Sequence, residues 1–206
     1  MITNNPKILS YVTHPYVYWD NFFTDDELNL IEKYCNECEF PLDKGIDYSD
    51  GVNERDGTPK SIRKSDVKFI HKTKDSTWIF DRLNAITDHI NCQFYNYDLT
   101  GYGFLQYTEY NKKGDLYGYH TDMVFGDINN PDIILPRKLS FSLIISDPSK
   151  FKGGDFEFDI PGNTRIVEQK RGRIIAFPSF VKHQVTPIKS GVRKSIVWWA
   201  VGPKFK

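Results

Sequence analysis

Three side chains in the second half of the sequence could together hold a metal ion: His120, Asp122 and His183. Alternate side chains of a β-strand point to the same face, so a strand through 119–123 would project His120 and Asp122 together. His183, from another strand, would supply the third ligand. Two histidines and one carboxylate leave coordination positions open, an arrangement typical of non-haem Fe(II) sites at which O2 and a co-substrate bind.

Arg193 follows the third candidate ligand, His183, by ten residues, and its position suggests a second binding function. The turn expected at 187–191 predicts a hairpin in which His183 faces either Arg193 or Ser195, depending on where the turn is centred. An unpaired arginine on the inner face of a barrel would cost several kcal/mol. A dicarboxylic ligand would satisfy it through a two-pronged pair with the guanidinium fork.

The elements that must position these residues change in character along the chain. A capping box at 24–27 and apolar residues at helical spacing predict helices after 24 and near 76. The segment 41–66, rich in Asp, Gly, Lys and Ser, is predicted to be a long mobile loop and a candidate lid. Two or three helices followed by about eight strands predict a mainly β jelly roll with the helices packed on one sheet. The strand candidates are 104–110, 139–145, 155–159, 173–177 and 194–201.

The chain has 206 residues, with 27 Lys+Arg and 27 Asp+Glu, so its formal net charge is zero. This length favours a single domain over 1–206, with helical and loop support in 1–93 and the β core in 94–206. Zero net charge argues against partners held by bulk charge, such as nucleic acid or an anionic membrane. We expect a cytoplasmic protein, because no membrane span or signal peptide is visible.

The ordered set of motifs from Gln106 to Val201 resembles the 2-oxoglutarate and Fe(II)-dependent dioxygenases, specifically their prolyl 4-hydroxylase-like branch. The segment 20–28 also resembles that branch's entry into its first helix, so the resemblance extends beyond the β region. The matching pieces are Tyr110, His120-x-Asp122, Arg137, Gly153–Phe156, Gly172–Ser179, His183, Pro187, Gly191-x-Arg193 and Trp199.

The resemblance implies a cupin-like double-stranded β-helix that holds Fe(II) through the two histidines and Asp122. It implies that Arg193 pairs with the distal carboxylate of 2-oxoglutarate, that Ser195 adds a hydrogen bond there, and that Tyr110 also contacts the co-substrate. Relatives often have a further tyrosine in the strand after Arg137. Here the strand 139–145 has none, so Ser140 or Ser142 could supply that hydrogen bond.

Three residues match places that meet the substrate in prolyl hydroxylases: Tyr117, Arg137 and Trp199. Trp199 has the same strand parity as Arg193, so it should point inward while Trp198 points out. The apolar segment 123–136 could cover the substrate mouth.

The predicted activity is hydroxylation of a C–H bond, with 2-oxoglutarate and O2 converted to succinate and CO2 and with ascorbate as reductant. Branch resemblance favours a peptidyl proline as substrate, and a free amino acid or another small molecule is the alternative. Asp122 argues against a halogenase, which needs a small residue there. A nucleic-acid demethylase is also disfavoured, because those relatives carry a second arginine at the position where this chain has Trp199. A non-catalytic jelly-roll binding module or a cupin-like isomerase is the alternative of a different class.

Overall fold

The computed structural model describes residues 14–45, 48–52, 59–123 and 135–203. Besides strands and two α-helices, these residues form a π-helical turn at Asn91–Tyr95 and a 3-10 turn at Pro148–Lys150. In chain order the main elements are β1 (Val17–Trp19), α1 (Asp25–Glu37), β2 (Leu42–Gly45), β3 (Tyr48–Val52), β4 (Pro59–Ser61), β5 (Arg63–Ile70), α2 (Thr77–Ile90), β6 (Leu105–Tyr110), β7 (Leu116–His120), β8 (Arg137–Ile144), β9 (Lys152–Gly153), β10 (Phe156–Ile160), β11 (Asn163–Val167), β12 (Ile174–Pro178), β13 (His183–Val185), β14 (Ile188–Ser190) and β15 (Arg193–Val201).

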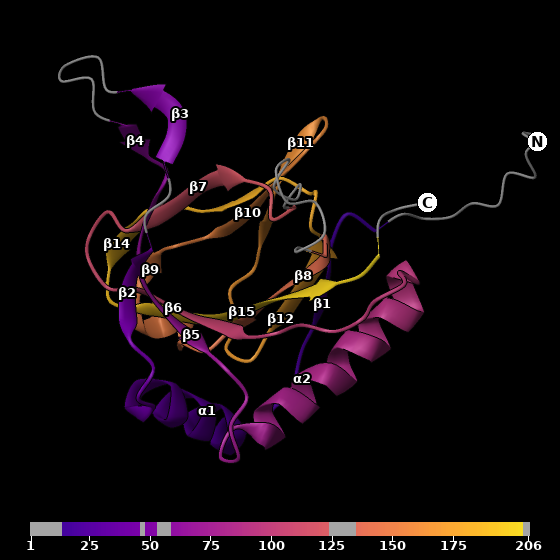
Figure 1. Cartoon of the computed structure of the whole chain (residues 1–206). Coiled ribbons are helices and arrows are strands. Elements are labelled where there is room, and N and C mark those ends of the chain that lie inside the picture. Colours follow the sequence, from indigo (N-terminus) through magenta and orange to yellow (C-terminus); the bar gives the residue numbers. More distant parts are fainter. Residues whose placement is uncertain (1–13, 46–47, 53–58, 124–134, 204–206) are drawn as a thin grey trace, which may run out of the picture.

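Most strands join one curled antiparallel sheet with the order β1-β12-β8-β15-β6-β5-β7-β13-β10-β11 (Figure 1). The strand β5 links its two halves, because Asp66–Ile70 pairs with β6 whereas Arg63 and Lys64 pair with β7. The sheet thereby folds back on itself, and its inner faces enclose an apolar cluster that includes Phe156, Phe158 and Phe177. This arrangement confirms the predicted jelly roll.

The two helices cover the outer face of the half that contains β6, β8, β12 and β15 (Figure 1). The helix α1 begins at the predicted capping box, in which Thr24 and Glu27 exchange hydrogen bonds, and buries Leu28, Ile31 and Cys35. The helix α2 buries apolar residues at its predicted spacing. Neither helix of the described residues is long and apolar enough to cross a membrane.

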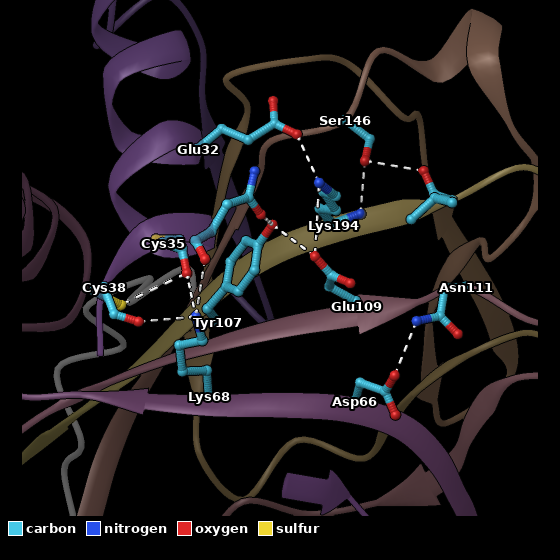
Figure 2. Close-up of polar contacts among 12 residues, drawn as sticks. Glu32, Cys35, Cys38, Asp66, Lys68, Tyr107, Glu109, Asn111, Ser146 and Lys194 are labelled. Atoms are coloured by element: carbon cyan, nitrogen blue, oxygen red, sulfur yellow. Dashed lines mark hydrogen bonds and ion pairs between the residues drawn. The ribbon is translucent and has the colours of Figure 1, made fainter. Parts of the chain in front are cut away.

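Polar side chains dock α1 onto the sheet, as Figure 2 shows. The Lys68 ammonium on β5 donates to the carbonyl of Cys35 at 2.8 Å and to the carbonyls of Asn36 and Cys38, both at 3.3 Å. A cation suits this position because the carbonyls at a helix C-terminus have no partner within the helix. On β15, Lys194 pairs with Glu32 of α1 at 2.9 Å. The network therefore fixes how α1 lies across β5 and β15.

The segment 41–66, predicted to be a long loop, forms strands over most of its described residues. β2 pairs with β5, and β3 pairs with β4 in a separate ribbon that projects from the body on the side away from the helices (Figure 1). The prediction was wrong because β5 buries polar side chains, including Arg63, Ser65 and Asp66, so it has no apolar pattern. Residues 46–47 and 53–58 lie outside the described part, and the lid stays a prediction.

Candidate metal and co-substrate site

The structure brings the three predicted metal ligands together at the end of β7 and the start of β13. His120 Nε2 lies 3.5 Å from one carboxylate oxygen of Asp122, and His183 Nε2 lies 3.6 Å from the other. One ligand atom from each residue falls within 4.8 Å of the others. Asp122 lies just beyond β7 rather than inside a strand, and its backbone N–H donates to the Ser179 carbonyl at 2.9 Å. The Met123 N–H donates to the same carbonyl at 3.0 Å, and the two bonds hold the backbone of Asp122 beside His120.

Both histidines present the same ring nitrogen to the site. The Nδ1–H of His120 donates to the Gly118 carbonyl at 2.8 Å, and that of His183 donates to the Val181 carbonyl at 3.0 Å. These bonds fix the tautomer that leaves each Nε2 lone pair free to bind a metal.

The charges of the ligand set also suit a cation. Burial alone would raise the pKa of Asp122, but His183, His120 and a hydrogen bond from Ser140 hold it below its usual value. Burial lowers the pKa of His183 to about 4, although Asp122 opposes that shift. At neutral pH the set is therefore an ionised carboxylate and a neutral His183 imidazole, and a hard or borderline divalent cation fits it.

Aromatic rings enclose His183 on the inner side of the barrel. Phe156 stacks on its ring with centroids 5.4 Å apart, and Phe177 lies 4.5 Å away at a steeper angle. Such walls limit the access of water to the ligand atoms and hold the ring in place.

Arg193 faces the same cavity from β15 and is 1% exposed. Its Nη1 donates to the Ser195 hydroxyl at 3.2 Å, and its guanidinium carbon lies 5.5 Å from the centre of the Tyr110 ring. Within the described residues, its Nε and Nη2 have no hydrogen-bond acceptor. Burial lowers the pKa of Arg193, while Tyr110 and Asp155 oppose that change. A buried guanidinium with two unused donors is arranged to receive an anionic group.

The second glycine of the Gly153-Gly154 pair before β10 is needed to make room for Arg193. Its φ is +66°, and a Cβ there would lie 2.8 Å from Cδ of Arg193 and 2.6 Å from Cδ1 of Ile188. Only glycine leaves room for the arginine stem in that backbone conformation.

His183 and Arg193 do not lie on neighbouring strands, so the predicted hairpin was wrong. β13 pairs with β7 and β10, whereas β15 pairs with β6 and β8. The chain between them forms β14, which pairs with β9. The two residues therefore face one cavity from different halves of the sheet, a long-range arrangement that local turn signals could not predict.

The remaining predicted residues also reach this region. Tyr110, Ser195, Tyr117 and Trp199 line the cavity, whereas Trp198 points to the helices and donates from Nε1 to the Thr87 hydroxyl. Tyr110 is buried, and burial raises its pKa.

Arg137 stacks on the Trp199 ring, with its guanidinium carbon 3.9 Å from the ring centre. Ser142 lines the cavity, whereas the Ser140 hydroxyl bonds the Ser179 hydroxyl at 2.9 Å in addition to Asp122. The segment predicted to cover the mouth lies mostly outside the described residues, at 124–134.

Comparison with known sequences supports this chemistry. The sequence model of the 2OG-Fe(II) oxygenase superfamily matches residues 105–201. A PKHD-type hydroxylase of Synechococcus sp. (strain CC9902) is 38% identical over 86 residues, which make up 42% of this chain and 36% of that protein. A PKHD-type hydroxylase of Prochlorococcus marinus is 34% identical over 87 residues, 42% of this chain and 37% of that protein. The matched segment thus spans little more than a third of these relatives.

Solved structures match nearly the whole chain in fold. A Pseudomonas putida prolyl-4-hydroxylase has a TM-score of 0.66 at 20% identity, covering 95% of this chain and 96% of its own. The viral collagen prolyl hydroxylase of Paramecium Bursaria Chlorella virus-1 has a TM-score of 0.64 at 16% identity, covering 93% and 97%. Residues 105–201 therefore match the sequence pattern of the 2OG-Fe(II) oxygenase superfamily. The chain as a whole has a prolyl 4-hydroxylase-like fold.

Proposed function

We propose that the protein is a 2-oxoglutarate- and Fe(II)-dependent dioxygenase that hydroxylates a C–H bond. One observation carries the proposal: the buried Arg193, with two donors unused among the described residues, faces the same cavity as the three ligand side chains. A buried cation without a counter-charge is costly, and the distal carboxylate of 2-oxoglutarate would offset that cost. A non-catalytic jelly-roll module has no need of this combination.

The residues present fit the iron and the co-substrate in donor type and protonation. When bound, Fe(II) would supply the oxidising chemistry, in which 2-oxoglutarate and O2 become succinate and CO2 and one oxygen atom enters the substrate C–H bond. The two histidines and the ionised carboxylate hold the metal. Arg193 and Ser195 bind and orient the distal carboxylate. The Tyr110 hydroxyl stays protonated because its pKa is raised, so it can donate a hydrogen bond to the co-substrate. Phe156 and Phe177 keep water from the ligands.

A peptidyl proline is the proposed substrate. The Trp199 ring lines the cavity, and its flat apolar surface suits a proline ring. Arg137 stacks on the ring and holds its plane. The Trp199 indole N–H is buried and has no acceptor among the described residues, so it could donate to a peptide carbonyl. The fold also resembles a Trichoplax adhaerens prolyl hydroxylase solved with a hypoxia inducible factor peptide, with a TM-score of 0.64 at 17% identity over 92% of this chain and 84% of that one.

The test is incubation with Fe(II), 2-oxoglutarate and ascorbate, together with a panel of proline-containing peptides and free amino acids. We expect iron-dependent succinate and a mass gain of one oxygen atom on a peptide. Trp199→Ala should slow peptide hydroxylation while substrate-uncoupled succinate formation persists. Oxygen gain on a free amino acid would favour the small-molecule alternative. A protein that binds iron and 2-oxoglutarate yet forms no succinate would refute the proposed activity.

A further inference from the structure

The ring of His120 is the end member of a stack of three planar groups. The Tyr117 ring lies flat on the His120 ring, with centroids 3.5 Å apart and an interplanar angle of 12°. The Arg63 guanidinium carbon lies 4.6 Å from the centre of the same Tyr117 ring. Because His120 covers one face of the tyrosine so closely, the guanidinium lies against the other face. The stack therefore runs from β5 through β7 to the candidate metal ligand.

A β-bulge makes this stack possible. Residues three apart on a regular strand point to opposite faces, so Tyr117 and His120 should not meet. Across the strand pair, however, His183 faces His120 while Val185 faces Tyr117, so three intervals on β7 oppose two on β13. The extra residue turns Tyr117 to the side of His120. The Gly118 N–H donates to the Ile62 carbonyl at 2.6 Å, which holds the bulge against the start of β5.

Arg63 is fixed at the outer end of the stack. It is 8% exposed, its Nε donates to the Ser65 hydroxyl at 3.1 Å, and it lies directly opposite Tyr117 in the β5–β7 pair. A buried guanidinium over an aromatic face is attracted to the ring and holds its plane. The hydrogen bond from Nδ1 to the Gly118 carbonyl fixes the line along which that N–H points. The flat contact with Tyr117 prevents the His120 ring from rotating about this line.

We propose that Arg63 and Tyr117 are positioning residues that hold His120 for metal binding. Contacts to a ligand from outside the coordination sphere typically change metal affinity by about 10- to 100-fold. His183 is held by different aromatic residues, Phe156 and Phe177, on the inner side of the barrel. The stack of Arg63 and Tyr117 therefore positions His120. The inference rests on the proposed function because it presumes a metal at the three ligands.

The test is calorimetric titration of Mn(II), a redox-stable probe, into the metal-free full chain without 2-oxoglutarate or substrate. Tyr117→Leu removes the flat contact and should weaken binding about 10-fold or more. Tyr117→Phe keeps the ring and should bind like the wild type. Arg63→Met keeps an unbranched stem but removes the charged guanidinium, and it should weaken binding about fivefold, with Arg63→Lys intermediate.

Tyr119→Leu is the matched control on the same strand. The Tyr119 hydroxyl donates to Glu157 at 3.4 Å. Within the described residues, the aromatic contacts of the metal ligand His120 are with Tyr117 and His183 and not with Tyr119, so the affinity for Mn(II) should not change. Thermal unfolding of each metal-free variant separates local from global effects. Wild-type affinity in a folded Tyr117→Leu or Arg63→Met would overturn the role of that residue alone. A wild-type protein that binds no metal would overturn the proposed function and this inference together.

Discussion

Replacing Arg193 by methionine should stabilise the ligand-free protein while removing its affinity for 2-oxoglutarate. The side chain is 1% exposed, and two of its nitrogens have no acceptor among the described residues. Methionine matches the arginine stem as far as Nε and lacks the charged end of the guanidinium. The substitution therefore removes a buried cation whose donors are largely unused.

The expected magnitudes follow from these contacts. Each buried donor without an acceptor costs about 1–3 kcal/mol, and the variant gives up the single hydrogen bond to Ser195, worth about 1 kcal/mol. The two donors less this hydrogen bond would give a gain of about 1–5 kcal/mol, and the space that the guanidinium leaves unfilled reduces it. We expect a net gain of about 1–2 kcal/mol in the free energy of unfolding, with each kcal/mol raising Tm by about 2–4 °C in a chain of this size. Losing the charge-assisted pair with the co-substrate should cost about 2–5 kcal/mol, or about 30-fold or more in affinity.

Urea unfolding of the metal-free protein measures the first effect, and calorimetric titration of 2-oxoglutarate into Mn(II)-loaded protein measures the second. Arg193→Lys is the control, because it keeps a charge without the planar fork; its affinity should be intermediate, with no gain in stability. A less stable Arg193→Met would show that the guanidinium is already satisfied in the free protein. Unchanged affinity for 2-oxoglutarate would remove Arg193 from the co-substrate site.

Three further predictions concern the ligand set, the glycine beside Arg193 and an ion pair. His183→Ala should lose Mn(II) binding in calorimetry yet unfold cooperatively, since two ligands do not hold the ion; wild-type metal content would exclude His183 from the site. Gly154→Ala should weaken 2-oxoglutarate binding about 10-fold by displacing the Arg193 stem; unchanged affinity would show that the stem adjusts. Arg173 holds the pKa of Asp20 below its usual value through two bonds of 2.8 Å. Asp20→Asn should therefore cost about 1–2 kcal/mol at pH 7, and urea unfolding should show this difference shrinking as pH falls below about 4; a constant difference would contradict the ion-pair origin.

The residue types of the site and the local elements were predictable from the sequence. Helix α1 follows from its capping box and its apolar stripe, because helical hydrogen bonds and side-chain spacing are local properties. Strand parity predicted that Trp199 faces the cavity and Trp198 the helices. The motif order predicted the three ligands and Arg193 as one set.

The tertiary structure alone decided how these residues meet. The strand β5 has no apolar pattern, because its buried residues Arg63 and Lys68 are stabilised by groups on β7 and α1 that are distant in sequence. His183 and Arg193 approach from different halves of the curled sheet, since strand pairing is long-range and a local turn signal does not specify it. The bulge that lays Tyr117 on His120 breaks strand parity, and it becomes visible only in the pairing of β7 with β13 and in the hydrogen bond from Gly118 to Ile62.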